Sequence, residues 1–148
     1  MKIRSIIGVA LAALAVAVAL PAMAQGTGET IKPNFDRVIP NMPGKSLIAV
    51  TIDYAPGGAS PAYAHAKSAF IYAYVVSGEI ESQVDDGPKR VYHAGESFAE
   101  DPGSIHRVSR NASPTKPARL LAVIVVDTDD KPLTTVVKRW FQKEPKGC

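Results

Sequence analysis

The residues of this chain best suited to chemistry are two histidines and a tyrosine. Tyr63 and His65 are two positions apart, so on an extended strand their side chains point to the same face. His106 follows 41 positions after His65, and a turn rich in glycine and proline precedes each histidine. Neutral imidazole is a common ligand of transition metals. The pattern therefore predicts either part of a metal site, formed where short strands meet, or two hydrogen-bonded structural histidines.

Other residues with ligand chemistry lie close to the second histidine. His93 ends a short strand-like run, where an exposed turn residue is the simplest interpretation. Glu96 and Glu100 follow it, and either could complete the site if its side chain points inward. A carboxylate beside two imidazoles would give the ligand set that suits non-haem iron. Because Glu100 directly precedes a turn, we expect it to be solvated.

Tyrosines supply the candidates for a ligand pocket. Tyr72 and Tyr74 alternate with apolar residues, so one face of their strand carries both phenols. Such side chains either pack in a core with a satisfied hydroxyl or line a pocket. The predicted pocket residues are Tyr63, Tyr72 and Tyr74.

Short strand-like runs separated by turns make up most of the chain. The turns recur about every 8–12 residues and no amphipathic helix is apparent, which is typical of an all-β, antiparallel barrel or sandwich. Ser77-Gly78 is predicted to be a hairpin turn, and Pro56-Gly57-Gly58 to end a strand. The predicted strands are residues 47–54, 70–76, 79–84, 90–93, 97–100, 105–109 and 119–126, with a final strand or edge segment at 134–141.

Residues 1–24 have the pattern of a secretory signal peptide. Lys2 and Arg4 precede an almost wholly apolar run, and an Ala-x-Ala pattern then predicts cleavage before Gln25. The apolar run is about 15 residues long, which is short of the ~20 needed to span a bilayer. We therefore expect a periplasmic or secreted protein, with no membrane attachment after cleavage.

Length and charge limit what the rest of the chain can be. The 148 residues suffice for one domain. The formal charge is +3, but without the two basic residues of the leader there are 17 − 2 = 15 basic and 14 acidic residues. No basic block interleaved with aromatic residues remains, so we expect no nucleic-acid partner. The single cysteine, Cys148, is either an incidental tail residue or a site of intermolecular pairing.

Three regions are predicted after the signal peptide. Residues 25–45 are expected to form an extended arm, residues 46–127 a barrel, and residues 128–148 a C-terminal strand and tail. The arm could lie against the barrel wall or against a second subunit. A homodimer is therefore one of the predicted assemblies.

The order of glycines, prolines and histidines resembles the two motifs of the cupin superfamily. The first motif is a glycine, five residues, His-x-His, a glutamate and a later glycine, and the second is a glycine, Pro-Gly, a histidine and an asparagine. The matching residues are Gly57, Tyr63-Ala64-His65 and Gly78, then Gly95, Pro102-Gly103, His106 and Asn111. The resemblance covers residues 47–126 and implies a small, single-domain jelly-roll barrel.

The resemblance also implies a partial metal site. Metal-binding cupins use the two histidines and the glutamate of the first motif and the histidine of the second. Of these, His65 and His106 are present, and Tyr63 stands in the place of the first histidine as a candidate third ligand. None of the residues in the glutamate position can ligate; depending on the count they are Ala69, Phe70 or Ile71. The implied cofactor is none, or one divalent ion of iron, manganese, nickel, copper or zinc.

Three functions follow as hypotheses. The first is an exported cupin-fold module that binds a small molecule with weak or no metal binding, and the missing motif-one carboxylate favours it. The second is a metal-dependent enzyme, for example a dioxygenase or isomerase, with His65 and His106 as ligands. The third is a structural module for dimerisation.

Overall fold

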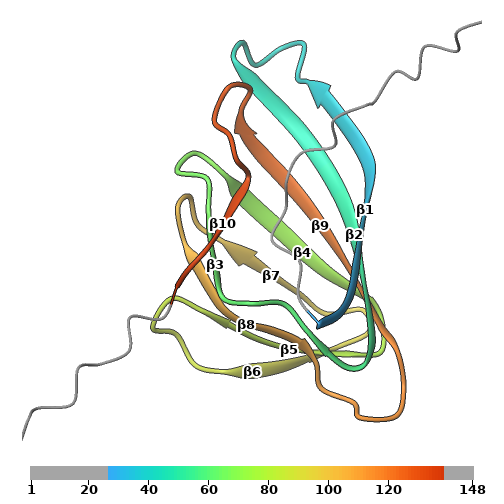
Figure 1. Ribbon diagram of the computed structural model, residues 1–148. Helices are drawn as coiled ribbons and strands as arrows, with labels where there is room; N and C mark the ends of the chain where they lie inside the picture. Colours follow the sequence, from blue (N-terminus) through green and yellow to red (C-terminus); the bar gives the residue numbers. More distant parts are fainter. Residues whose placement is uncertain (1–26, 139–148) are drawn as a thin grey trace, which may run out of the picture.

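The computed structural model describes residues 27–138, which form ten β-strands and no helix (Figure 1). The strands are β1 (Thr27–Val38), β2 (Lys45–Ala59), β3 (Tyr63–His65), β4 (Phe70–Ser77), β5 (Glu79–Val84), β6 (Arg90–His93), β7 (Ser97–Glu100), β8 (Ile105–Asn111), β9 (Ala118–Asp127) and β10 (Thr134–Val136). The predicted signal peptide and Cys148 lie outside the described residues. Within the described part, no helix could cross a membrane.

The strands make two layers that close on each other as a barrel. One layer has the order β1–β2–β9–β4–β7, and the other joins β10, β3, β8, β5 and β6 (Figure 1). All strand pairs are antiparallel, and the long strand β2 belongs to both layers: its first ten residues pair with β9, while Ala59 pairs with Arg110 of β8. The predicted all-β, single-domain barrel is therefore confirmed.

Buried and partly exposed side chains alternate along the strands of the first layer, and the buried ones form the barrel interior. In β2, Ile48, Val50, Ile52 and Tyr54 are buried, while the residues between them are only partly covered. The register places Ile48 opposite Ile124 of β9, which in turn lies opposite Ile71 of β4. Apolar side chains of three neighbouring strands thus meet on one face. Burying each such side chain contributes about 1.5–3 kcal/mol, which makes this face the main source of stability.

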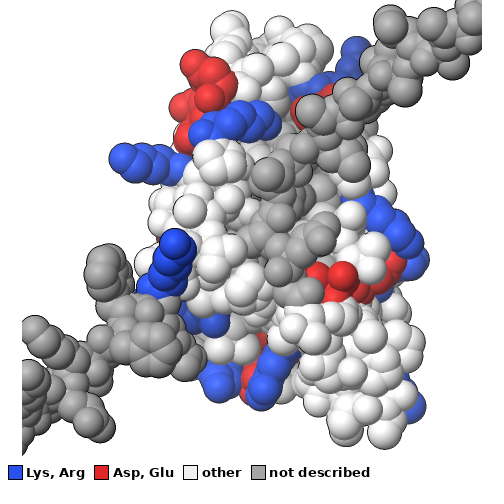
Figure 2. All heavy atoms as spheres, in the orientation of Figure 1, with Lys and Arg blue, Asp and Glu red and all other residues white. Residues whose placement is uncertain are grey.

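The predicted arm forms an integral strand of the barrel. Residues 27–38 are β1, which pairs with β2 over nearly its whole length. Ile31 lies opposite Ile52 and packs against the buried core. The outer face of the layer carries exposed apolar side chains from β1 and β4, namely Phe35, Phe70, Tyr72 and Val76. Basic and acidic side chains are interleaved on the face drawn in Figure 2, with no large area of one sign.

Two segments that were predicted to be a hairpin turn and a strand end have other roles in the structure. Ser77-Gly78 is not a hairpin turn, because β4 pairs with β7 and β9 whereas β5 pairs with β6 and β8. The chain crosses from one layer to the other there. Gly78 has a φ of 74°, and a Cβ atom on it would lie 2.6 Å from the carbonyl oxygen of Pro117, so only glycine fits. The segment Pro56-Gly57-Gly58 does not end its strand either, since β2 continues to Ala59.

Candidate metal centre

Strand β3 brings the three predicted residues together. Tyr63 lies directly opposite His106 of β8, and His65 lies opposite Thr134 of β10. Cross-strand partners share a face of the sheet, and so do residues two apart on one strand. Tyr63, His65 and His106 therefore all project into the barrel interior, where His106 is 1% exposed.

A fourth side chain, Glu100, enters from the opposite layer. Strand β7 pairs with β4 so that Glu100 lies opposite Ile71 and Phe98 opposite Ala73. Ile71 and Ala73 are core residues, so their partners also face inward, and Glu100 is only 3% exposed. The expectation that Glu100 is solvated is wrong. The turn begins after this residue, and the alternation of outward and inward side chains along β7 extends to it.

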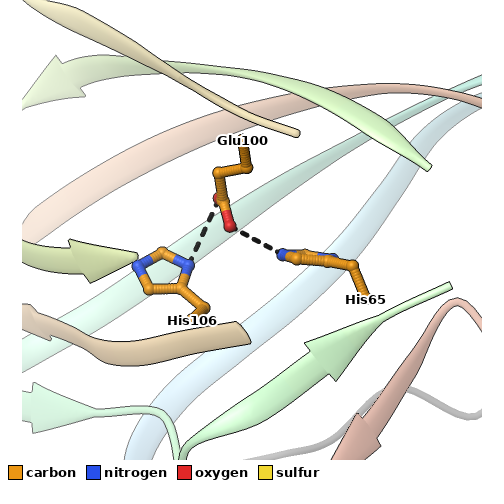
Figure 3. A group of neighbouring side chains, drawn as sticks. All are labelled: His65, Glu100 and His106. Atoms are coloured by element: carbon orange, nitrogen blue, oxygen red, sulfur yellow. Dashed lines mark hydrogen bonds and ion pairs between the residues drawn. The ribbon is translucent and has the colours of Figure 1, made fainter. Parts of the chain in front are cut away.

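Glu100 joins the two histidines across the barrel (Figure 3). Its Oε2 lies 2.9 Å from Nε2 of His65, and its Oε1 lies 3.3 Å from Nδ1 of His106. The hydroxyl of Tyr63 is 3.1 Å from the same nitrogen of His106. On the other side of that ring, Oγ of Ser82 lies 2.9 Å from Nε2. Each layer thus supplies part of one connected polar group.

The hydrogen bonds fix one proton of His65 and allow two tautomers of His106. A carboxylate only accepts, so Nε2–H of His65 donates to Glu100, and Nδ1 of His106 donates to it in the tautomer that carries the proton on that nitrogen. In that tautomer Nε2 of His106 accepts from the hydroxyl of Ser82; in the other, Nε2–H donates to Ser82 and the hydroxyl of Tyr63 donates to Nδ1. The Nδ1 atom of His65 is buried and has no hydrogen-bond partner among the described residues. The network is therefore complete around His106 and open at His65.

The environment keeps Glu100 charged and Tyr63 neutral. Burial raises the pKa of Glu100, but hydrogen bonds from His106 and His65 outweigh that effect and lower the pKa to about 2. Burial also raises the pKa of Tyr63 well above its usual value near 10, with nearby Tyr54 and Glu100 adding to the shift. The site thus offers one anionic oxygen, two imidazoles and a neutral phenol.

These donors fit a divalent transition metal. The ligand atoms of His65, Glu100 and His106 all lie within 4.8 Å of one another. Adjacent ligands bound at about 2.1 Å are about 3 Å apart, close to the separations of Glu100 from each histidine. Two imidazoles and one carboxylate form the set that suits non-haem iron and related ions. Ser82 supplies the outer hydrogen bond that usually orients a ligating histidine.

The centre faces a small cavity inside the barrel. The room for the centres of water-sized atoms is about 40 Å³. That space holds about three water molecules. Its walls are mainly apolar, formed by Ile31, Val50, Ile52, Ile71, Leu120 and Ile124. A small molecule of a few heavy atoms could therefore reach the histidines.

Other predicted site residues lie away from this cavity. Tyr72 is 45% exposed and Tyr74 is partly exposed, because Ile71, Ala73 and Val75 occupy the inner face of β4. The prediction that Tyr72 and Tyr74 line the pocket needs correction, whereas Tyr63 does line it. The remaining candidates, His93 and Glu96, lie beside each other at the surface. Together with Glu79, which is close to His93, they form a separate surface group.

Sequence reasoning named Glu100 only as a carboxylate that could complete the site, expected it to be solvated, and missed Ser82. Glu100 lies opposite Ile71, one of the positions where the first cupin motif would place its glutamate. The signal was its spacing of two from Phe98, an apolar residue of the same predicted strand. Nothing in the sequence distinguished Ser82 from other serines, because serine is common on both buried and exposed faces of strands.

Comparisons with known proteins agree with this architecture. A family model described as a cupin domain matches residues 50–124. No curated protein sequence matches the chain significantly.

Solved structures show the same fold at low sequence identity. An oxalate oxidase in complex with glycolate is 22% identical with a TM-score of 0.56, and the match covers 74% of this chain and 55% of the other. The Cupin_2 domain of an XRE family transcriptional regulator from Enterobacter cloacae is 25% identical with a TM-score of 0.52. The match covers 66% of this chain and 95% of that domain. KdgF from Halomonas sp. is 21% identical with a TM-score of 0.51, and the match covers 70% of this chain and 82% of KdgF. The chain thus spans little more than half the length of the oxalate oxidase.

Proposed function

The chain belongs to the cupin family, and we propose that it is a metal-binding cupin that admits a small molecule beside one divalent transition metal ion. The observation that carries this proposal is the buried carboxylate of Glu100, in contact with both His65 and His106. The sequence favoured a barrel with little or no metal binding because a carboxylate ligand was missing. Glu100 supplies one from the neighbouring strand.

Each residue of the centre has a distinct part in this proposal. His65, His106 and Glu100 would hold the ion, which when bound supplies Lewis acidity or activation of oxygen. Ser82 orients His106, and the neutral phenol of Tyr63 can donate a hydrogen bond to a molecule in the cavity. The apolar walls limit the access of water and the size of the ligand.

The alternative is a metal-free barrel that binds a small molecule, in which Glu100 only satisfies two structural histidines. Taking a carboxylate out of water is costly, and a hydrophobic core is often as stable as a buried ion pair. A site that pairs three buried polar groups around a cavity is therefore poorly explained by stability alone. This argument favours the metal-binding function over the alternative.

Metal content of the mature protein, purified without chelators, tests the proposal. We expect about one equivalent of a transition metal by elemental analysis, and loss of most of it in His65→Ala and Glu100→Gln. Glu96→Gln is the matched control, since this glutamate is exposed and belongs to the surface group. If the protein holds no metal even after reconstitution with iron, manganese, nickel, copper or zinc, the metal-free alternative is correct.

We also propose that the protein is exported, on the evidence of the leader pattern in residues 1–24. Expression in a bacterial host and N-terminal sequencing of the product test this directly. The expected first residue is Gln25, and a cytoplasmic product that retains Met1 would contradict export.

A further inference from the structure

The cavity has a second polar end, formed by Glu29 of β1. Glu29 lines the same cavity as the histidines and lies opposite Tyr54 in the sheet. The hydroxyl of Ser60 donates a hydrogen bond to its carboxylate. The hydroxyl of Tyr54 is 2.7 Å from Oγ of Ser60 and 2.9 Å from Oγ of Ser109. Three hydroxyl groups thus form a network that holds Glu29 at the cavity wall.

The charges around the cavity favour some ligands over others. Two carboxylates, Glu29 and Glu100, line it, and none of the described lining residues is a lysine or arginine. A divalent ion held by Glu100 and two neutral histidines would be balanced by the second carboxylate, so the loaded cavity carries no net charge. A small dianion would bring two further negative charges into a space with apolar walls and no basic side chain. Such uncompensated charge is strongly disfavoured there.

We propose that Glu29 determines the class of ligand: a small neutral or cationic molecule that offers an oxygen donor to the metal and a hydroxyl, amide or amine hydrogen to Glu29. This inference rests on the proposed metal-binding function. A carboxylate accepts several hydrogen bonds at once, so Glu29 can hold Ser60 and a ligand together. Small dicarboxylates are disfavoured by charge.

Three probes of nearly the same shape separate charge from size. Oxalate, oxamate and oxamide each have six heavy atoms, carry two, one and no negative charges, and gain N–H donors in that order. Binding is measured by calorimetry on metal-loaded protein, with metal content determined before and after each titration. We expect the wild-type protein to bind oxamide at least about tenfold more tightly than oxalate.

Substitution of Glu29 provides the decisive comparison. Glu29→Gln keeps the shape and removes the charge, so the ratio of oxamide to oxalate affinity should fall by about tenfold. Ser60→Ala should shift the ratio in the same direction by less, because it removes the hydrogen bond that holds Glu29 at the cavity wall but leaves the charge of Glu29 in place. Glu79→Gln, an exposed substitution outside the cavity, is the control and should leave the ratio unchanged.

The outcomes distinguish this inference from the function on which it rests. A metal-loaded protein that prefers oxalate, or whose preference is the same in Glu29→Gln as in the wild type, overturns the role of Glu29 and leaves the metal site standing. A protein that cannot be loaded with metal overturns the proposed function and this inference together. Unfolding curves of each variant show whether the fold is retained.

Discussion

Two groups of histidine and glutamate in this protein have similar chemistry in opposite surroundings. The inner cluster is His65, Glu100 and His106, and the outer cluster is Glu79, His93 and Glu96. The shortest separations between an imidazole nitrogen and a carboxylate oxygen are alike, 2.9 Å in the inner cluster and 3.1 Å in the outer one. The side chain of Glu100 is 3% exposed, whereas that of His93 is 63% exposed.

The difference shows that contact geometry alone does not make a site. In water, an ion pair is worth about 0–1 kcal/mol, because solvent screens the charges and competes for the hydrogen bonds. In the barrel interior, each polar group depends on its partners, because no bulk water replaces a lost hydrogen bond. The inner cluster also faces a cavity, so its donors could be offered to an ion or a ligand.

Removal of the central carboxylate should give the largest contrast between the clusters. In Glu100→Ala, Nε2 of His65 loses its acceptor and Nδ1 of His106 loses the adjacent carboxylate, while both atoms stay buried. We expect the free energy of unfolding to fall by about 3 kcal/mol. Glu96→Ala should change it by less than about 0.5 kcal/mol. Urea denaturation of the metal-free proteins measures both, and equal losses would mean that burial does not distinguish the clusters.

Acid should affect the inner cluster through Glu100. Its folded-state pKa is about 2 against an ordinary value of 4.5, so its stabilising contribution is fully present above pH 4.5 and is lost as the pH falls towards 2. The contribution is on the order of 3 kcal/mol. Glu100→Gln lacks it, so the difference in unfolding free energy between wild type and variant should shrink over this range.

The outer cluster provides the control for the effect of acid on stability. The pKa of Glu96 is also lowered, by hydrogen bonds from the backbone and side chain of His93, but the group is exposed. Glu96→Gln should therefore follow the wild-type acid denaturation curve closely. A gap between wild type and Glu100→Gln that stays constant from pH 5 to pH 2 would contradict a strongly lowered pKa for Glu100.

Two buried serines sharpen the comparison within the barrel. The hydroxyl of Ser82 forms a hydrogen bond with Nε2 of His106, whereas that of Ser104 is buried without a partner among the described residues. Ser82→Ala should cost about 1–2 kcal/mol and weaken metal binding by about 10- to 100-fold. Ser104→Ala should be nearly neutral, because no hydrogen bond is lost. Thermal unfolding and competition with a metal chelator measure the two effects, and similar results for both serines would argue against a role for Ser82 in orienting His106.

The sequence predicted most of the strands, though not β1 or β3, because the alternation of side chains is a local property. The run 97–100 coincides with β7, and 47–54 lies within β2. Pairing is not local, and that is why the turn at Ser77-Gly78 was misassigned. A two-residue gap between strands is compatible with a hairpin or with a crossing between layers, and only the partners of β4 and β5 distinguish them.

The site was predictable in part for the same reason. Tyr63 and His65 share a face by spacing, but which face of a strand is inward depends on the whole barrel. In β4 both faces are apolar or aromatic, so the pattern could not show that Ile71 faces inward and Tyr72 outward. Glu100 was hidden by its position beside a turn, although its spacing of two from Phe98 already indicated the inner face.

The smallest effect is expected from the outer histidine. His93 contacts Glu96 through Nδ1 at 3.1 Å and lies 3.8 Å from Glu79, so the surface group has the residue types of a metal site. Its side chains are free to hydrate, and ordering them around an ion would cost entropy that the inner cluster has already lost on folding. His93→Ala should therefore change the free energy of unfolding by less than about 0.5 kcal/mol and leave the metal content at the wild-type level. A loss of metal in His93→Ala, with the metal retained in His65→Ala, would place the bound ion at the surface, because only the outer cluster is altered by the first substitution.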